Sequence, residues 1–309
     1  MTDRFVERVL VVMVVLFALW VTVVGLGAQA SRGASTSSLA PPPAIAYPQP
    51  RTSGFKPPRT ADGRPDLQGY WSISEYVDGS RVTSPIALDI QAHEENAWVR
   101  KHQSVVVDPK DGKVPYQEWA LKKKSELVRS EFIEYIGGVD PHVKCYRNAP
   151  PRQIYAPGGV QILQEKDRVL IINEWDGNAR IVPTDGRAHI GKRFSLFIGD
   201  PIGSWDGDTF VIDTTNLNGN AWLSANGDFT MPDLHIVERF TMMSSDRILY
   251  SATLDAPSVY TRPWTMAFRM VRNTEAGYQQ MEFACHEGEK TLKNIQEAHP
   301  GAQSGIVVR

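Results

Sequence analysis

Short apolar stretches separated by turn residues fill the second half of the chain, from Gly159 onward. Runs rich in β-branched and aromatic residues, bounded by glycine, proline, asparagine or aspartate, are typical of antiparallel strands in a meander. Asp176-Gly177 and Asp206-Gly207 favour hairpin turns, because both dipeptides tolerate positive φ. The pattern predicts strands over residues 160–164, 168–174, 179–182, 194–198, 209–215, 235–242, 248–254, 264–271 and 278–285.

A further strand is expected through Gly69, Tyr70 and Trp71, which brings the total to about ten. Sequential hairpins would place these strands side by side, and the resulting sheet must then hide its two edges. Curling into a barrel removes the edges, and a barrel of roughly eight to ten strands leaves room for a small ligand. We therefore expect a mainly β domain whose antiparallel meander closes into a barrel.

Apolar residues at helical spacing precede the β region. One helix is expected over residues 89–102. A second starts with Pro115 as a first-turn residue and ends at Gly137-Gly138. This helical part, about residues 86–138, would lie on the sheet as a lid or a brace.

Residues 9–28 form an almost unbroken apolar run that follows Arg4 and Arg8. A run of roughly 20 apolar residues can span a bilayer, whereas Ala28-Gln29-Ala30 is a site of the kind that a signal peptidase accepts. Residues 1–30 are therefore either a cleaved signal peptide or a membrane anchor. Both alternatives place the rest of the chain outside the cytoplasm, in the periplasm, secreted, or held at the inner membrane.

Residues 31–59 are rich in serine, alanine and proline and cannot bury enough apolar surface to fold. We expect a disordered linker there, followed by a single domain over residues 60–309. The formal net charge of -2 leaves no basic surplus to neutralise phosphates, which disfavours nucleic acid as a partner. The expected partners are a small molecule and, if residues 9–28 are retained, the membrane.

The chain has two cysteines, Cys145 and Cys285. In an oxidising compartment, a single disulfide closing a long loop is the natural hypothesis. Two buried free thiols are the alternative. A cysteine–histidine nucleophile at Cys285 and His286 is disfavoured, because neighbouring residues on a strand point to opposite faces.

Strand alternation places Glu238 on one face with three apolar residues; they are Ile236, Phe240 and Met242. If this face points inward, desolvation would raise the pKa of Glu238 and suit it to acid–base catalysis. A buried salt bridge to an arginine, or a reversed strand face, is the alternative. The other residues that could join Glu238 in an acid–base pocket or a metal site are Glu282, His286, Glu174, Asp213, His189 and His235.

No His-x-His or His-Glu-x-x-His pattern supports a metal, so we expect neither metal nor cofactor. Three tryptophans in the β half are candidates for lining a cavity that holds a flat hydrophobic ligand; they are Trp175, Trp205 and Trp264. Arg187, Arg239 and Glu174 are further candidate ligand-binding residues. The loop that carries Arg187 could hold a carboxylate at the barrel mouth, or Arg187 could simply pair with Asp185 in solvent.

Gly69 and Trp71 on the first strand resemble the Gly-x-Trp signature of lipocalins. This resemblance implies an arginine late in the barrel that packs on the tryptophan, a role open to Arg269 or Arg272. Over a longer span the chain resembles a large family of exported bacterial proteins of unassigned function, and this likeness implies export and a shared fold but no activity. The segments that carry it are residues 61–67, 203–209, 234–241, 260–265 and 285–288.

Three functions follow from these patterns. The leading hypothesis is a barrel that binds a small apolar or aromatic molecule. The alternative is an acid–base enzyme of the hydratase, dehydratase or isomerase type, with Glu238 and a histidine in the cavity. A structural envelope protein is the second alternative, and it would have a filled interior and an exposed apolar patch.

Overall fold

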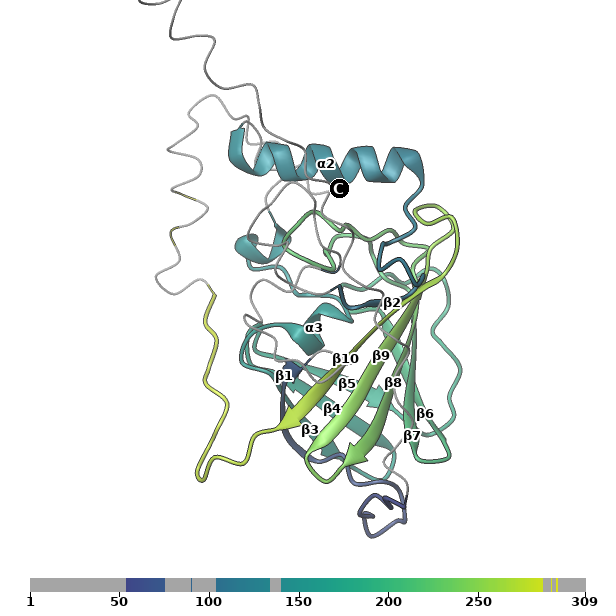
Figure 1. The fold of residues 1–309 in the computed structure, drawn as a ribbon, viewed down its shortest axis with the longest axis vertical. Helices are drawn as coiled ribbons and strands as arrows, with labels where there is room; N and C mark the ends of the chain where they lie inside the picture. The colour runs from purple at the N-terminus through teal and green to yellow at the C-terminus, as the bar shows by residue number, and fades with distance from the viewer. Residues whose placement is uncertain are drawn as a thin grey trace, which may run out of the picture. The chain divides into compact units, whose positions relative to one another are not determined.

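A computed structural model describes residues 54–75, 90, 104–133, 140–285, 290 and 293 (Figure 1). All of them belong to one compact unit, Pro41–Arg309. Within these ranges, no helix has both the length and the hydropathy that crossing a membrane requires. The apolar run over residues 9–28, and nearly all of the expected linker and of the first expected helix, lie outside the described residues.

The described part is mainly β: nine strands form an antiparallel meander that is a nearly closed barrel (Figure 1). In chain order they are β1 Gly69–Glu75, β3 Val160–Gln164, β4 Arg168–Asn173, β5 Asn178–Pro183, β6 Asp200–Asp206, β7 Thr209–Thr215, β8 His235–Ser244, β9 Arg247–Asp255 and β10 Trp264–Arg272. A short strand, β2 Val106–Asp108, pairs with β10 beside this path. The mainly β fold and the antiparallel meander expected from the hairpin pattern are therefore confirmed, and the barrel that they form is nearly closed.

The first strand lies between the last strand and β3. β1 pairs with β10, with Trp71 opposite Arg272, and also with β3, with Gly69 opposite Ile162. Among the described residues, no ladder joins β5 to β6. β6 nevertheless passes close to the residue that follows β5. A Cβ added to Gly203 would lie only 2.9 Å from the Thr184 methyl group.

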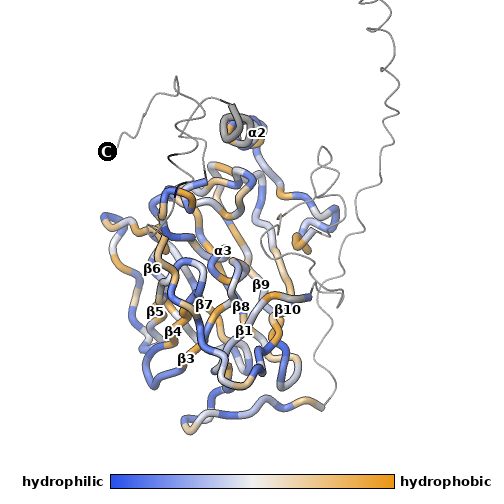
Figure 2. Tube along the Cα trace, turned by 90° about the vertical axis from the view of Figure 1, so that its left-hand side faces the viewer, coloured by the Kyte–Doolittle hydropathy of each residue, from blue (hydrophilic) through white to orange (hydrophobic). Residues whose placement is uncertain are grey.

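Alternation along the strands builds the core. β7 and β8 bury every second residue, and hydropathy along the trace shows apolar positions recurring in the strands (Figure 2). Because one face of each strand is buried, a register slip by one residue would turn its apolar side chains to solvent. The burial pattern thereby fixes which side chains enter the barrel.

Helices lie at one end of the barrel. The helix expected after Pro115 is confirmed as α2 Glu118–Ile133, which lies beyond the strands in both views (Figures 1 and 2). A 3-10 helix, η4 Pro141–Lys144, and a single-turn helix, α3 Arg152–Tyr155, follow it. Ile154 and Tyr155 of α3 are buried in the core.

Two expected strands are wrong. Residues 194–198 are not a strand but make one isolated bridge, between Leu196 and Leu217, because Asp200–Asp206 fills the ladder beside β7. The sequence does not predict this strand, because Pro201 and Gly203 both disfavour strand interiors. Proline is tolerated at a sheet edge, where β6 lies. Residues 278–285 also form no strand, because the neighbouring β3 and β4 already have partners on both sides.

Candidate binding site inside the barrel

Glu238 on β8 points into the barrel and is 0 % exposed. The Arg180 guanidinium reaches it from β5: Nη2 donates to the Glu238 Oε2 at 2.5 Å and to the Thr214 hydroxyl at 2.8 Å. Arg180 is buried as well. The buried salt bridge that the strand pattern left open for Glu238 is thus present.

Tyr250 on β9 holds the other carboxylate oxygen. Its hydroxyl donates to the Glu238 Oε1 at 2.9 Å. Burial, and then the charge and hydrogen bond of Glu238, raise the pKa of Tyr250 well above its ordinary value, so the phenol stays protonated and remains a donor. Both oxygens of Glu238 are therefore engaged by protein donors.

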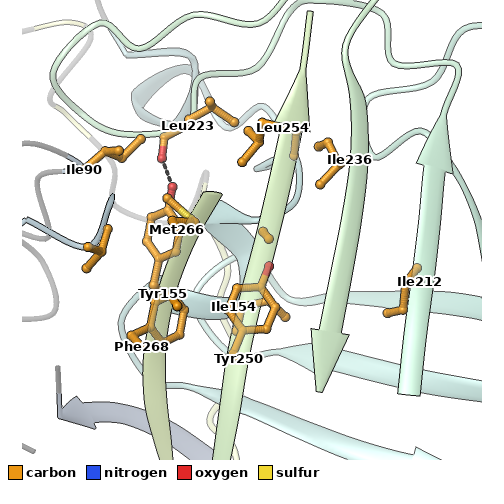
Figure 3. Packing of buried hydrophobic residues seen from close by; sticks show 14 of the residues in the cluster. Ile90, Ile154, Tyr155, Ile212, Leu223, Ile236, Tyr250, Leu254, Met266 and Phe268 are labelled. Atoms are coloured by element: carbon orange, nitrogen blue, oxygen red, sulfur yellow. Dashed lines mark hydrogen bonds between the residues drawn. The ribbon is translucent and has the colours of Figure 1, made fainter. Parts of the chain in front are cut away.

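Aromatic rings line the interior around this pair. Tyr250 lies 5.0 Å from Phe240 and 4.8 Å from Phe268, measured between ring centroids. Figure 3 shows Tyr250 and Phe268 on neighbouring strands, with Tyr155 of α3 beside them. Rings at such separations attract one another beyond the area they bury, which stabilises a well-defined apolar wall.

Four buried polar atoms in this region have no hydrogen-bond partner among the described residues. They are Nε and Nη1 of Arg180, and Nε2 and Oε1 of Gln153. Gln153 belongs to α3, whose backbone accepts a hydrogen bond from the Asn173 amide on β4. β4 also carries Ile171, the residue directly opposite Arg180. The backbone of Gln153 therefore contacts β4, the strand that pairs with the one carrying Arg180.

Unpaired buried polar groups are rare, because each costs about 1–3 kcal/mol when its hydrogen bond is not made. The guanidinium offers two further donors, and the Gln153 amide offers a donor and an acceptor. A molecule with polar atoms in these positions would satisfy them. In the part of the chain that the structure describes, no group of three or more His, Cys, Asp or Glu residues could hold a metal ion.

Two of the predicted histidines, His189 and His235, do not contact Glu238. His189 and His235 lie outside the barrel, where their Nε2 atoms contact the Asp213 Oδ1 at 3.2 and 2.9 Å. His189 also contacts the Asp200 carboxylate through Nδ1, at 3.0 Å. His286 lies outside the described residues, and Glu282 is an exposed residue in the irregular segment 278–285.

The three candidate tryptophans occupy different environments. Trp264 is a core residue that packs against Tyr260. Trp205 is half-buried, with its ring centroid 5.0 Å from that of Phe210. Trp175 lies outside the interior cluster, where it stacks with His142 and Phe283 at centroid distances of 5.5 and 5.4 Å.

The remaining candidates also lie outside the interior cluster. Arg187 pairs with Asp185 at 2.5 Å in an exposed ion pair. This is the alternative in which Arg187 pairs in solvent and does not hold a ligand carboxylate at the barrel mouth. Arg239 makes an exposed ion pair with Asp206. Glu174 accepts a hydrogen bond from the Tyr278 hydroxyl at 2.7 Å. The sequence patterns pointed to these charged residues and did not reveal Arg180. The one indication that Arg180 is buried is its position two residues before the buried Val182 on the same strand, since residues two apart share a face.

Cys145 and Cys285 form a disulfide, with their Cα atoms 5.7 Å apart. It attaches the C-terminal segment to the turn that follows η4. Next to it, the His142 ring faces Trp175 and Phe283.

The loop between β7 and β8 ties both helices to the barrel. Asp228 in this loop is buried and accepts hydrogen bonds from Lys124 of α2, from the Ser224 hydroxyl and from the Tyr116 hydroxyl, the last at 2.5 Å. Burial alone would raise the pKa of Asp228, but the charge and hydrogen bond of Lys124 outweigh it and lower that pKa. The Tyr155 hydroxyl of α3 donates to the Leu223 carbonyl in the same loop (Figure 3).

Trp71 on β1 packs against Arg272 on β10. The guanidinium carbon of Arg272 lies 4.2 Å from the centroid of the Trp71 ring. Arg272 Nη1 also donates to the Gln68 carbonyl at 2.6 Å. The neighbouring Gly69 has no room for a Cβ, because that atom would collide with the same guanidinium. This explains why glycine precedes the tryptophan by two residues.

Comparison with family models, with curated proteins and with solved structures finds no match for this chain.

Proposed function

We propose that this protein is an extracytoplasmic barrel that binds a small, largely apolar or aromatic molecule in its interior. The observation that carries the proposal is that buried polar atoms of Arg180 and Gln153 have no hydrogen-bond partner among the described residues. Arg180 shares the Glu238 carboxylate with Tyr250, whose ring lies beside Phe240 and Phe268. Ligand sites commonly combine an apolar lining with a few polar groups that orient the ligand.

The charge around Arg180 favours a neutral polar group on the ligand. Arg180 and Glu238 together carry no net charge, and a carboxylate beside them would also meet the negative charge of Glu238. A carbonyl, ether or hydroxyl oxygen can accept from the two remaining donors without that repulsion. The ligand class is therefore an aromatic or other apolar molecule with a neutral oxygen.

The nearly closed barrel supports this proposal. Its first strand joins β10 to β3, and Trp71 on that strand packs under Arg272. The Cys145–Cys285 disulfide and the apolar run over residues 9–28 agree with a protein that leaves the cytoplasm.

The acid–base alternative has less support. A general base needs an oxygen within reach of the proton that it removes, whereas Arg180 and Tyr250 occupy both oxygens of Glu238. Its expected partners His189 and His235 contact Asp213 instead. Binding without chemistry is the function that this geometry supports best.

Native mass spectrometry of the protein purified from its own host tests the proposal. We expect a mass excess that corresponds to one small molecule per chain and that disappears on denaturation. Gln153→Met, which keeps the side-chain length but removes the amide, should lower the occupied fraction. The control variant Lys122→Met, at an exposed position on α2, should keep the occupied fraction of the wild type. Unliganded protein in every preparation, together with no retained compound after exposure to a host extract, would refute binding.

A further inference from the structure

Three large apolar side chains project into solvent within seven residues of the segment between β5 and β6. Ile190, Phe194 and Leu196 are 40, 56 and 42 % exposed. We refer to residues 190–196 as the apolar loop. Large apolar side chains gathered on a surface mark a site of interaction rather than ordinary surface composition.

The backbone of the apolar loop is held by hydrogen bonds to neighbouring segments. The Asn216 amide donates to the carbonyls of Gly191 and Phe194, at 3.1 and 2.8 Å. The Asp200 carboxylate accepts from the backbone N–H of Ile190 at 2.8 Å. The Leu196 N–H donates to the Asn216 carbonyl at 2.8 Å. The exposed residues are thus presented on a fixed scaffold.

Two adjacent cations, Lys192 and Arg193, lie between Ile190 and Phe194. Lys192 and Arg193 are exposed, and neither forms an ion pair or hydrogen bond with any residue that the structure describes. The loop contains no acidic residue. Apolar side chains interspersed with lysine and arginine match an anionic membrane surface, where the apolar groups enter the interface and the cations meet lipid phosphates.

The rest of the chain can bring the loop to such a surface. Residues 9–28 are apolar enough to enter a bilayer. The roughly 25 residues between that run and the first described residue could extend at most about 80–90 Å, at about 3.3–3.6 Å per residue. A membrane-held domain would therefore remain within reach of the same bilayer.

We infer that the apolar loop docks the folded barrel on an anionic phospholipid surface. This contact is separate from the ligand proposed above and does not depend on it. α2 also exposes Trp119 and Leu121, but there the Trp119 indole donates to the Ser258 carbonyl and its ring packs against Phe229. The acidic Glu118 lies beside it on the same helix. The apolar loop is the better match to a lipid surface.

The test uses the full chain in vesicles, with one nitroxide label on Ser195→Cys in the apolar loop. The control label is on Ser245→Cys, an exposed serine in the β8–β9 turn. Because Cys145 and Cys285 are bridged, only the introduced cysteine reacts. Collision of the label with oxygen and with a water-soluble nickel chelate is measured by electron paramagnetic resonance. The vesicles are phosphatidylcholine with phosphatidylglycerol, or phosphatidylcholine alone.

With phosphatidylglycerol present, the label at position 195 should collide more often with oxygen than with the nickel chelate. The label at position 245 should stay accessible to the chelate. Each of Lys192→Ser and Arg193→Ser should lower the ratio of docked to undocked loop about fivefold, and both together about 25-fold. Lys166→Ser, at an exposed lysine in the β3–β4 turn, should leave the ratio unchanged.

Two results would overturn the inference. One is a label at position 195 that is as accessible to the chelate as the label at position 245 in both kinds of vesicle. The other is that, in detergent solution without lipid, the label at position 195 becomes more shielded as the protein concentration rises. That result would identify a protein interface instead.

Discussion

Arg180 on β5 and Glu238 on β8 form an ion pair inside the barrel, although 58 residues separate them in the sequence. Both side chains are almost fully removed from solvent. Taking two charges out of water is costly, so such a pair is weak evidence for stability and better evidence for a specific role. Here the pair leaves two guanidinium donors unpaired beside aromatic side chains, which is the basis of the proposed binding site.

Glu238→Gln should destabilise the fold by about 3–5 kcal/mol, because it leaves the buried Arg180 charge without its partner. The double variant Arg180→Met with Glu238→Leu should recover most of this loss, since neither charge then remains. Urea unfolding of Arg180→Met, of Glu238→Leu and of the double variant measures the coupling. If the effects of these two single substitutions add up to the effect of the double variant, the buried pair is not present in solution.

Gln153→Met should stabilise the ligand-free protein by about 1–3 kcal/mol, because it removes an amide whose two polar atoms have no partner in the part of the chain that the structure describes. The same substitution should weaken ligand binding. Thermal unfolding with and without the retained molecule separates the two effects. A ligand-free protein that loses stability would show that another protein group satisfies the amide, contrary to this account.

Lys124→Met should cost about 3–5 kcal/mol, since it leaves the Asp228 carboxylate buried without a counter-ion. The matched substitution Lys122→Met, at an exposed position on the same helix, should change stability by no more than about 0.5 kcal/mol. Chemical denaturation compares the two. Equal effects would mean that the Lys124–Asp228 contact does not hold α2 to the barrel.

Stability should fall below about pH 6.5 through His142. Burial, and then the Arg152 charge, lower the pKa of His142 from its ordinary value of 6.5. The unfolded chain therefore binds a proton at a higher pH than the folded chain does, and acid favours unfolding. The Asn148 amide lies 3.4 Å from the His142 Nδ1, a contact that agrees with a neutral ring.

His142→Phe should keep the stack with Trp175 and remove this part of the pH dependence. Denaturation midpoints of the wild type and the variant, measured between about pH 5 and pH 8, provide the check. Parallel curves for the two proteins would assign the acid sensitivity to other groups.

The strands with clear alternation could be predicted from the sequence, because their signal is local. Residues 235–242 alternate between apolar and polar positions, and β8 runs over His235–Ser244. β6 was missed because Pro201 and Gly203 mask it locally, while the pairing with β7 that forms it is a tertiary contact. Residues 278–285 have strand composition, but no local pattern reveals that the nearby strand edges are already paired.

The same limit applies to the candidate site. Glu238 was identified because its apolar neighbours on β8 show which face is buried. Arg180 was missed because an arginine on a short strand is typical of a surface position, and its partners lie on β7 and β8. Gln153 lies on a single helical turn whose approach to β4 depends on the closed barrel. Sequence spacing carries no information about such contacts.

The central claim is that a bound molecule satisfies the unpaired atoms of Arg180 and Gln153. A high-resolution crystal structure of the protein purified from its own host tests it most directly. We predict density for an organic molecule with an oxygen within hydrogen-bond distance of the Arg180 Nε or Nη1 and another polar atom near the Gln153 amide. Density for ordered water alone at these atoms, or protein side chains rearranged to pair them, would contradict the account.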